Sequence, residues 1–63
     1  SSASKSEIVV PLIKNERLYG VIDVDSPEKN RFDRRDASFL EKTASLISNS
    51  SIPEYLKELC ERE

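Results

Sequence analysis

The sequence predicts a small α+β fold in which an antiparallel β-hairpin precedes a helix and a short C-terminal helix. Three observations support this prediction. Residues 7–13 and 18–25 are two runs rich in Val and Ile, separated by a short polar segment. From Asp33 onward, apolar residues recur at helical rather than strand spacing. Pro53 stands where the first turn of a further short helix would begin.

The hairpin is predicted from two strands and the turn between them. Residues 7–13, EIVVPLI, are almost continuously apolar, which is typical of a strand buried on both faces. Pro11 has no N–H to donate to a neighbouring strand, so we expect an edge or a bulge there. The turn is KNER, in which Asn15 can adopt a positive φ. Gly20, inside the second strand, indicates a close backbone approach or a local distortion.

The helical part begins after a loop opened by Ser26-Pro27. Asp33 is a good N-cap, and Asp36 three residues later completes an acidic capping box. The helix extends to about residue 48, where the polar run SNSS ends it, and PEYLKELC forms the second helix. Its broad apolar stripe favours core packing, with a dimer-forming surface as the alternative. The stripe consists of Ala37, Phe39, Leu40, Thr43, Ala44, Leu46 and Ile47.

Composition limits what this chain does alone. It has 63 residues, of which 37% are apolar and 6% aromatic, which is little for an independent core. We therefore expect a fragment of a larger domain, or a chain that needs a partner. Cys60 is the only cysteine and there is no histidine, so neither an intrachain disulfide nor a metal site is expected.

Charge and hydropathy exclude two classes of partner. The net charge is −2 and the two signs are interspersed, which argues against a nucleic-acid interface. No apolar run approaches the length of a membrane helix, and the N-terminal residues do not resemble a signal peptide. A free cysteine without a disulfide framework favours a reducing, cytoplasmic location.

Two aspartates in the apolar second strand are the candidate functional residues. Asp23 and Asp25 are two apart, so their side chains share a face, where like charges oppose folding. The alternative is an ordinary solvated face. Glu7 joins them only in one register. A two-residue turn in a regular ladder sets Glu7 opposite Val24, whereas an odd loop or one bulge residue sets it opposite Asp25. A position of Glu7 before the regular ladder is the remaining possibility.

Three segments carry a resemblance to a known family. SEIVVPL, GVIDVDSP and RFDRRD resemble the C-terminal part of a GAF-fold free methionine-(R)-sulfoxide reductase. Glu7, Asp23, Asp25 and Ser26 stand at that family's spacing. The resemblance implies a GAF-like antiparallel sheet with packed helices. Residues 1–48 would form the C-terminal half of this domain, and residues 49–63 a linker and short helix.

The resemblance also implies a function. It is the thiol-dependent reduction of free methionine-(R)-sulfoxide, in defence against oxidative stress. Glu7, Asp23 and Asp25 would be catalytic and substrate-binding, supplying protons to the sulfoxide oxygen and binding the substrate ammonium. Which carboxyl takes which role is open. No cofactor is implied, but a thioredoxin-type reductant is expected, as is a homodimer.

The thiol half of that site is expected upstream. The family's nucleophilic cysteine would fall just before Ser1, which stands where the family usually has Asp. Cys60 lies in the wrong element to replace it and is expected to be an inert, partly buried thiol, so the isolated chain should be inactive. Residues 1–6 are either a flexible terminus or a loop beside the sulfoxide.

Two other functions are compatible with the same residues. The chain could belong to a GAF-type sensor that binds a small molecule without chemistry. It could also be a truncated, non-catalytic paralogue that pairs with a partner chain or with the missing N-terminal half.

Overall fold

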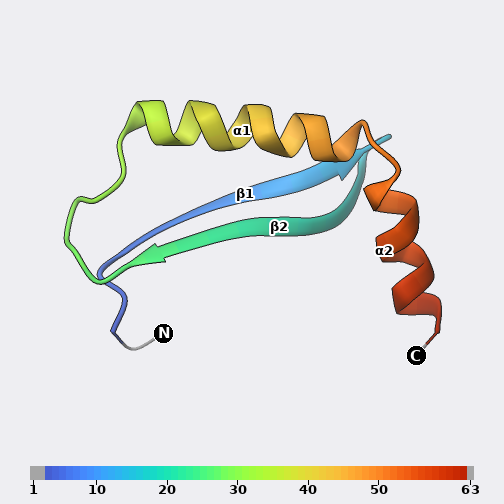
Figure 1. The fold of residues 1–63 in the computed structure, drawn as a ribbon, viewed down its shortest axis with the longest axis horizontal. Coiled ribbons are helices and arrows are strands. Elements are labelled where there is room, and N and C mark those ends of the chain that lie inside the picture. Colours follow the sequence, from blue (N-terminus) through green and yellow to red (C-terminus); the bar gives the residue numbers. More distant parts are fainter. Residues whose placement is uncertain (1–2, 63) are drawn as a thin grey trace.

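The computed structural model describes residues 3–62 and contains two strands followed by two helices (Figure 1). β1 (Ser6–Lys14) and β2 (Arg17–Ser26) form a two-stranded antiparallel sheet. α1 (Arg34–Ser48) runs along one face of this hairpin, and α2 (Ile52–Glu61) lies at its turn end. The predicted α+β arrangement is therefore confirmed.

The turn of the hairpin has two residues, both in the left-handed region. Asn15 has φ 52° and Glu16 has φ 63°, the pattern of a type I′ turn, whose twist matches that of paired strands. Asn tolerates this conformation, but a glutamate there is strained because its Cβ crowds the backbone.

Glu16→Gly should therefore stabilise the hairpin. Glycine adopts a positive φ without a steric penalty and is favoured at this turn position. We expect the free energy of unfolding of the full-length protein to rise by about 1 kcal/mol in urea titrations. Asn15→Gly is the matched control and should change it by much less, since asparagine already suits its φ. Equal effects of the two changes would show that strain at Glu16 is not the cause.

A single bulge residue sets the register of the ladder. Next to the turn, Lys14 pairs with Arg17 and Ile13 with Leu18. The following pair is Leu12 with Gly20, so Tyr19 has no partner of its own. Beyond this irregularity, each β1 residue faces a β2 residue one position later than a regular ladder would give.

The bulge explains the glycine in β2 only in part. Two explanations of Gly20 were expected from the sequence. The first, a local distortion of the strand, is confirmed, because Gly20 follows the unpaired Tyr19. The other explanation, a close backbone approach, was wrong, because a Cβ on Gly20 would lie 3.7 Å from Leu12 Cδ1, an ordinary contact.

The core lies between the hairpin and α1. Val10, Leu12 and Ala44 are buried there, with Ile8, Ile22, Leu40 and Ile47 packed around them. The capping box that begins α1 is formed as predicted. The Asp33 carboxylate accepts from the amides of Arg35 and Asp36, and the Asp36 carboxylate accepts from the Asp33 amide.

Two expectations about burial were wrong. β1 is not buried on both faces, since Val9 and Ile13 are 49% and 52% exposed. The reason is that α1 covers one face, and no other described element covers the opposite one. The apolar stripe of α1 is also narrower than predicted, because Phe39 and Leu46 turn to solvent, at 68% and 75% exposure.

α2 is held at the turn end by one buried residue and one ion pair. Pro53, at the start of the helix, is fully buried. Lys14 Nζ donates to Glu54 Oε1 at 2.7 Å, which lowers the pKa of that carboxyl.

Within residues 3–62, neither α1 nor α2 has the length and apolar character that a membrane-crossing helix requires.

Candidate active site

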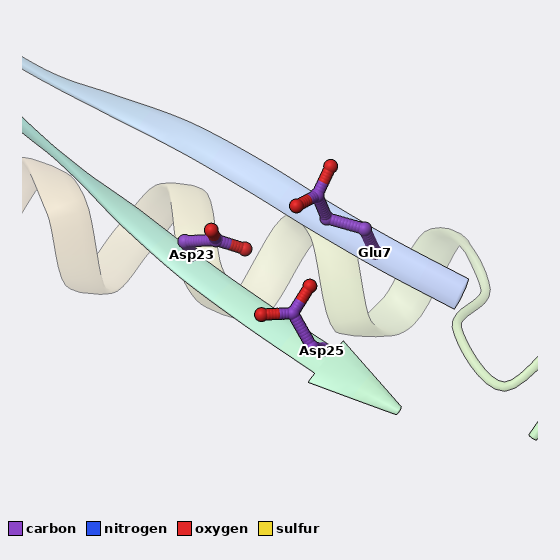
Figure 2. A group of neighbouring side chains, drawn as sticks. All are labelled: Glu7, Asp23 and Asp25. Carbon is purple, nitrogen blue, oxygen red and sulfur yellow. The ribbon is translucent and has the colours of Figure 1, made fainter. Parts of the chain in front are cut away.

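Three carboxylates meet at the open end of the hairpin, on the face that α1 does not cover. Figure 2 shows Glu7 on β1 and Asp23 and Asp25 on β2, with their side chains directed toward one another. One carboxylate oxygen from each lies within 4.8 Å of those of the others. All three residues are exposed. We call this group the carboxylate trio.

The trio exists because of the bulge. Past Tyr19, Glu7 pairs with Asp25 and Val9 with Asp23. In a regular ladder with the same two-residue turn, Glu7 would face Val24 and lie on the face opposite to the two aspartates. The structure thus adopts the bulged arrangement of the alternatives that the sequence left open, and brings all three predicted residues to one face.

Within the trio, the neighbouring carboxylates change the pKa of Glu7. The negative charge of Asp23 raises the pKa of Glu7 above its ordinary value, and a hydrogen bond to Asp25, possible when Glu7 is protonated, raises it further. The two effects have the same sign because a proton on Glu7 both removes a repulsion and supplies a donor. Glu7 therefore keeps its proton to a higher pH than an ordinary glutamate does.

A stability prediction follows from this shift. An acid whose pKa is raised by folding binds more protons in the native state than in the unfolded state, at pH values between its two pKa values. The parent should therefore lose stability as the pH rises through the raised pKa of Glu7. Glu7→Gln should be more stable than the parent at neutral pH, and the difference should vanish on acidification below the ordinary pKa of glutamate. Urea unfolding of the full-length protein across this pH range measures it, and a difference independent of pH would contradict it.

A shallow hollow adjoins the trio at the N-terminal end of β1. Its walls are formed by the first described residues of the chain and by the two paired carboxylates Glu7 and Asp25. The lining residues are Ser4, Lys5, Ser6, Glu7 and Asp25. Residues 4–6 thus stand beside the trio, whereas Ser1 lies outside the described residues.

A larger groove than this hollow lies elsewhere among the described residues. It runs between β1 and α1 and contains Val9, Ile13 and Ala44, with Glu41 as its one charged lining residue. This groove therefore lacks a cluster of groups that could exchange protons, whereas the trio is such a cluster.

The trio is also the one group of the described residues that could hold a metal ion. Carboxylate oxygens suit hard cations such as Mg²⁺ and Ca²⁺. No metal site was expected from the sequence, because the chain has no histidine and only one cysteine. A site made of carboxylates alone needs neither of these ligands. Exposed acidic groups are, however, common without an ion.

Cys60 is remote from the trio. It is exposed on α2, at the turn end of the hairpin, where it shares a groove with Leu18 and Tyr19. The expectation that it is partly buried was therefore wrong.

Ser6 is a residue at this site that was not among the predicted functional residues. It lies next to Glu7 and bonds to the loop after β2. Its place directly before Glu7, as the first residue of the segment SEIVVPL, was the signal that could have identified it.

Comparison with known proteins identifies relatives for most of the chain. A family model described as "GAF domain" matches residues 2–50. GAF domain-containing protein A of Dictyostelium discoideum is 49% identical over 49 residues, and Protein YtsP of Bacillus subtilis is 43% identical over 49 residues. Free methionine-R-sulfoxide reductase of Saccharomyces cerevisiae is 50% identical over 50 residues.

The matches cover much of this chain but little of the relatives. Each alignment spans 78% of this chain, but only 31%, 30% and 28% of the three relatives in the order given. No solved structure gives a significant match.

Proposed function

The chain belongs to the GAF domain family, and we propose that it forms the carboxylate-bearing part of an enzyme that reduces free methionine-(R)-sulfoxide to methionine. The observation that carries this proposal is the carboxylate trio, gathered on an open face by one bulge. The name of the yeast relative supports the choice of substrate. The nucleophilic thiol would come from residues that precede Ser1.

The trio suits the proton demand of this reaction. A cysteine thiolate attacks the sulfoxide sulfur, and the sulfur–oxygen bond of the substrate breaks while the oxygen takes up one proton. The substrate becomes a thioether, and the cysteine becomes a sulfenic acid that carries the oxygen. A second thiol then forms a disulfide and releases water. Glu7, whose pKa is raised by its neighbours, is the member of the trio that we assign as the proton donor.

The same face suits a free amino acid. The ammonium group of unbound methionine sulfoxide is a cation, whereas the corresponding nitrogen of a peptide-bound residue is a neutral amide. The carboxylate oxygens of Asp23 and Asp25 would accept charge-assisted hydrogen bonds from that ammonium. This pairing would also offset the repulsion within the trio, so substrate binding and site assembly would support each other.

The test is a coupled assay on the full-length protein. NADPH oxidation is followed with thioredoxin and thioredoxin reductase, on the free (R)-sulfoxide, the free (S)-sulfoxide and a peptide-bound sulfoxide. We expect turnover of the first substrate alone. Cys60→Ser is the matched control and should leave turnover unchanged, because Cys60 is on α2. Absence of turnover with all three substrates would overturn the proposal.

Two further arms separate the competing functions. Calorimetry with the free sulfoxide identifies a sensor if the ligand binds but is not turned over. Treatment with EDTA, followed by Mg²⁺ or Ca²⁺, tests the trio as a metal site. The proposal expects activity that is insensitive to EDTA, and loss and recovery with the metal would contradict the proton-holding role.

A further inference from the structure

The hairpin ends at its open side in a pair of serines. Ser6 faces Ser26 in the last pair of the ladder, directly before Glu7 and directly after Asp25. One more backbone bond follows, in which the Lys5 amide donates to the Ser26 carbonyl at 2.8 Å. Glu7 is therefore only one pair from the end of the sheet, where ladders open most easily.

The Ser6 hydroxyl joins this end to the loop that follows β2. It donates to the Glu28 carbonyl at 2.6 Å and accepts from the Arg31 amide at 3.2 Å. Ser26 Oγ in turn accepts from the Glu28 amide at 3.1 Å. The loop is thus hydrogen-bonded to the side chains of both serines, and one of them, Ser6, is adjacent to Glu7 in the chain.

Electrostatic repulsion among the three carboxylates opposes the pairing of Glu7 with Asp25 at this end of the hairpin. The charged groups that face Glu7 are Asp23 and Asp25 on β2, and Lys5 lines the hollow beside it. α1 covers the other face of the hairpin. Two carboxylates at this distance disfavour the approach of a third, so the end of β1 needs bonds outside the trio to keep Glu7 in place.

We propose that Ser6 is a positioning residue for the carboxylate trio: its hydroxyl bonds the loop after β2 to the end of β1 and so holds Glu7 opposite Asp25. The effect of Ser6 on catalysis rests on the proposed function, whereas its effect on the position of Glu7 does not. Because Ser6 and Glu7 are neighbours in a strand, their side chains lie on opposite faces. Ser6 therefore acts from the α1 side without touching the substrate.

The experiment compares three variants of the full-length protein. Ser6→Ala removes the hydroxyl, Ser6→Thr keeps it on a residue that favours strands, and Ser38→Ala, at an exposed position of α1, is the matched control. Two quantities are measured: kcat/KM for free methionine-(R)-sulfoxide, and the titration of the Glu7 carboxyl by ¹³C NMR. We expect Ser6→Ala to lower kcat/KM about tenfold and to move the Glu7 pKa toward its ordinary value. Ser6→Thr should restore both, and Ser38→Ala should change neither.

The two measurements separate failure of this inference from failure of the proposed function. If the parent does not reduce the sulfoxide, the proposed function is wrong, and the Glu7 titration alone decides the role of Ser6. If Ser6→Ala lowers the melting temperature but leaves the Glu7 titration unchanged, Ser6 is only a loop anchor and the inference is wrong. Should Ser6→Ala fail to fold, Ser6→Cys makes the same comparison, because it nearly keeps the shape and donates a weaker hydrogen bond.

Discussion

Glu7→Gln should lower kcat for free methionine-(R)-sulfoxide by about 10²–10⁴-fold in the full-length protein, the usual contribution of a general acid. Glutamine keeps the shape of the side chain but cannot give up a proton to the sulfoxide oxygen. Glu7 is expected to show this effect because its carboxyl, beside Asp23 and Asp25, has the raised pKa. The coupled assay, run with melting temperatures as a control for folding, measures it.

The two aspartates should respond differently from Glu7. Asp23 is the largest cause of the raised Glu7 pKa, so Asp23→Asn should lower that pKa. In the proposed mechanism activity requires protonated Glu7. The activity of Asp23→Asn should therefore decline with rising pH from a lower pH than the activity of the parent does. Asp25→Asn should appear mainly as a raised KM, through loss of a partner for the substrate ammonium. Each Asn variant should be at least as stable as the parent because a like charge is removed. Normal turnover in all three variants would rule out the trio as an acid cluster, and a sharp loss of stability would make the aspartates structural.

The isolated 63-residue chain should not behave as a cooperative monomer. Four apolar side chains of the hairpin are between about half and two thirds exposed: Val9, Ile13, Leu18 and Val21. A chain of this size that leaves such residues in water buries too little surface for independent stability. We propose that the rest of the domain, or a second chain, covers this face. Sedimentation should show self-association, and thermal unfolding should be broad.

Paired substitutions make this test specific to the open face. Val9→Thr with Val21→Thr should reduce self-association without disrupting the hairpin, since both residues are about half exposed. Val10→Thr is the matched control, because Val10 is 7% exposed and a hydroxyl there is buried against α1. It should destabilise by about 1–3 kcal/mol. A sharply cooperative, monomeric parent chain would refute the prediction.

The sequence alone determined the elements whose causes are local. The capping box of Asp33 and Asp36 depends on residues three apart, and the structure forms it as predicted. The shared face of Asp23 and Asp25 follows from the two-residue period of a strand, whatever the strand pairs with. The turn at Asn15 was also readable, because few residues other than glycine and asparagine accept a positive φ.

Only the tertiary structure decided which residues join Asp23 and Asp25. A two-residue turn and a bulge at Tyr19 together place Glu7 on their face, and the sequence permitted either register. The pKa of Glu7 depends on distances between side chains of two strands, and the exposure of Val9, Phe39 and Leu46 depends on which elements pack where. These quantities are pairwise and nonlocal, whereas propensity and periodicity describe one segment at a time. One unpaired residue in a ladder exchanges the two faces of everything beyond it, and no single-segment pattern records where that residue falls.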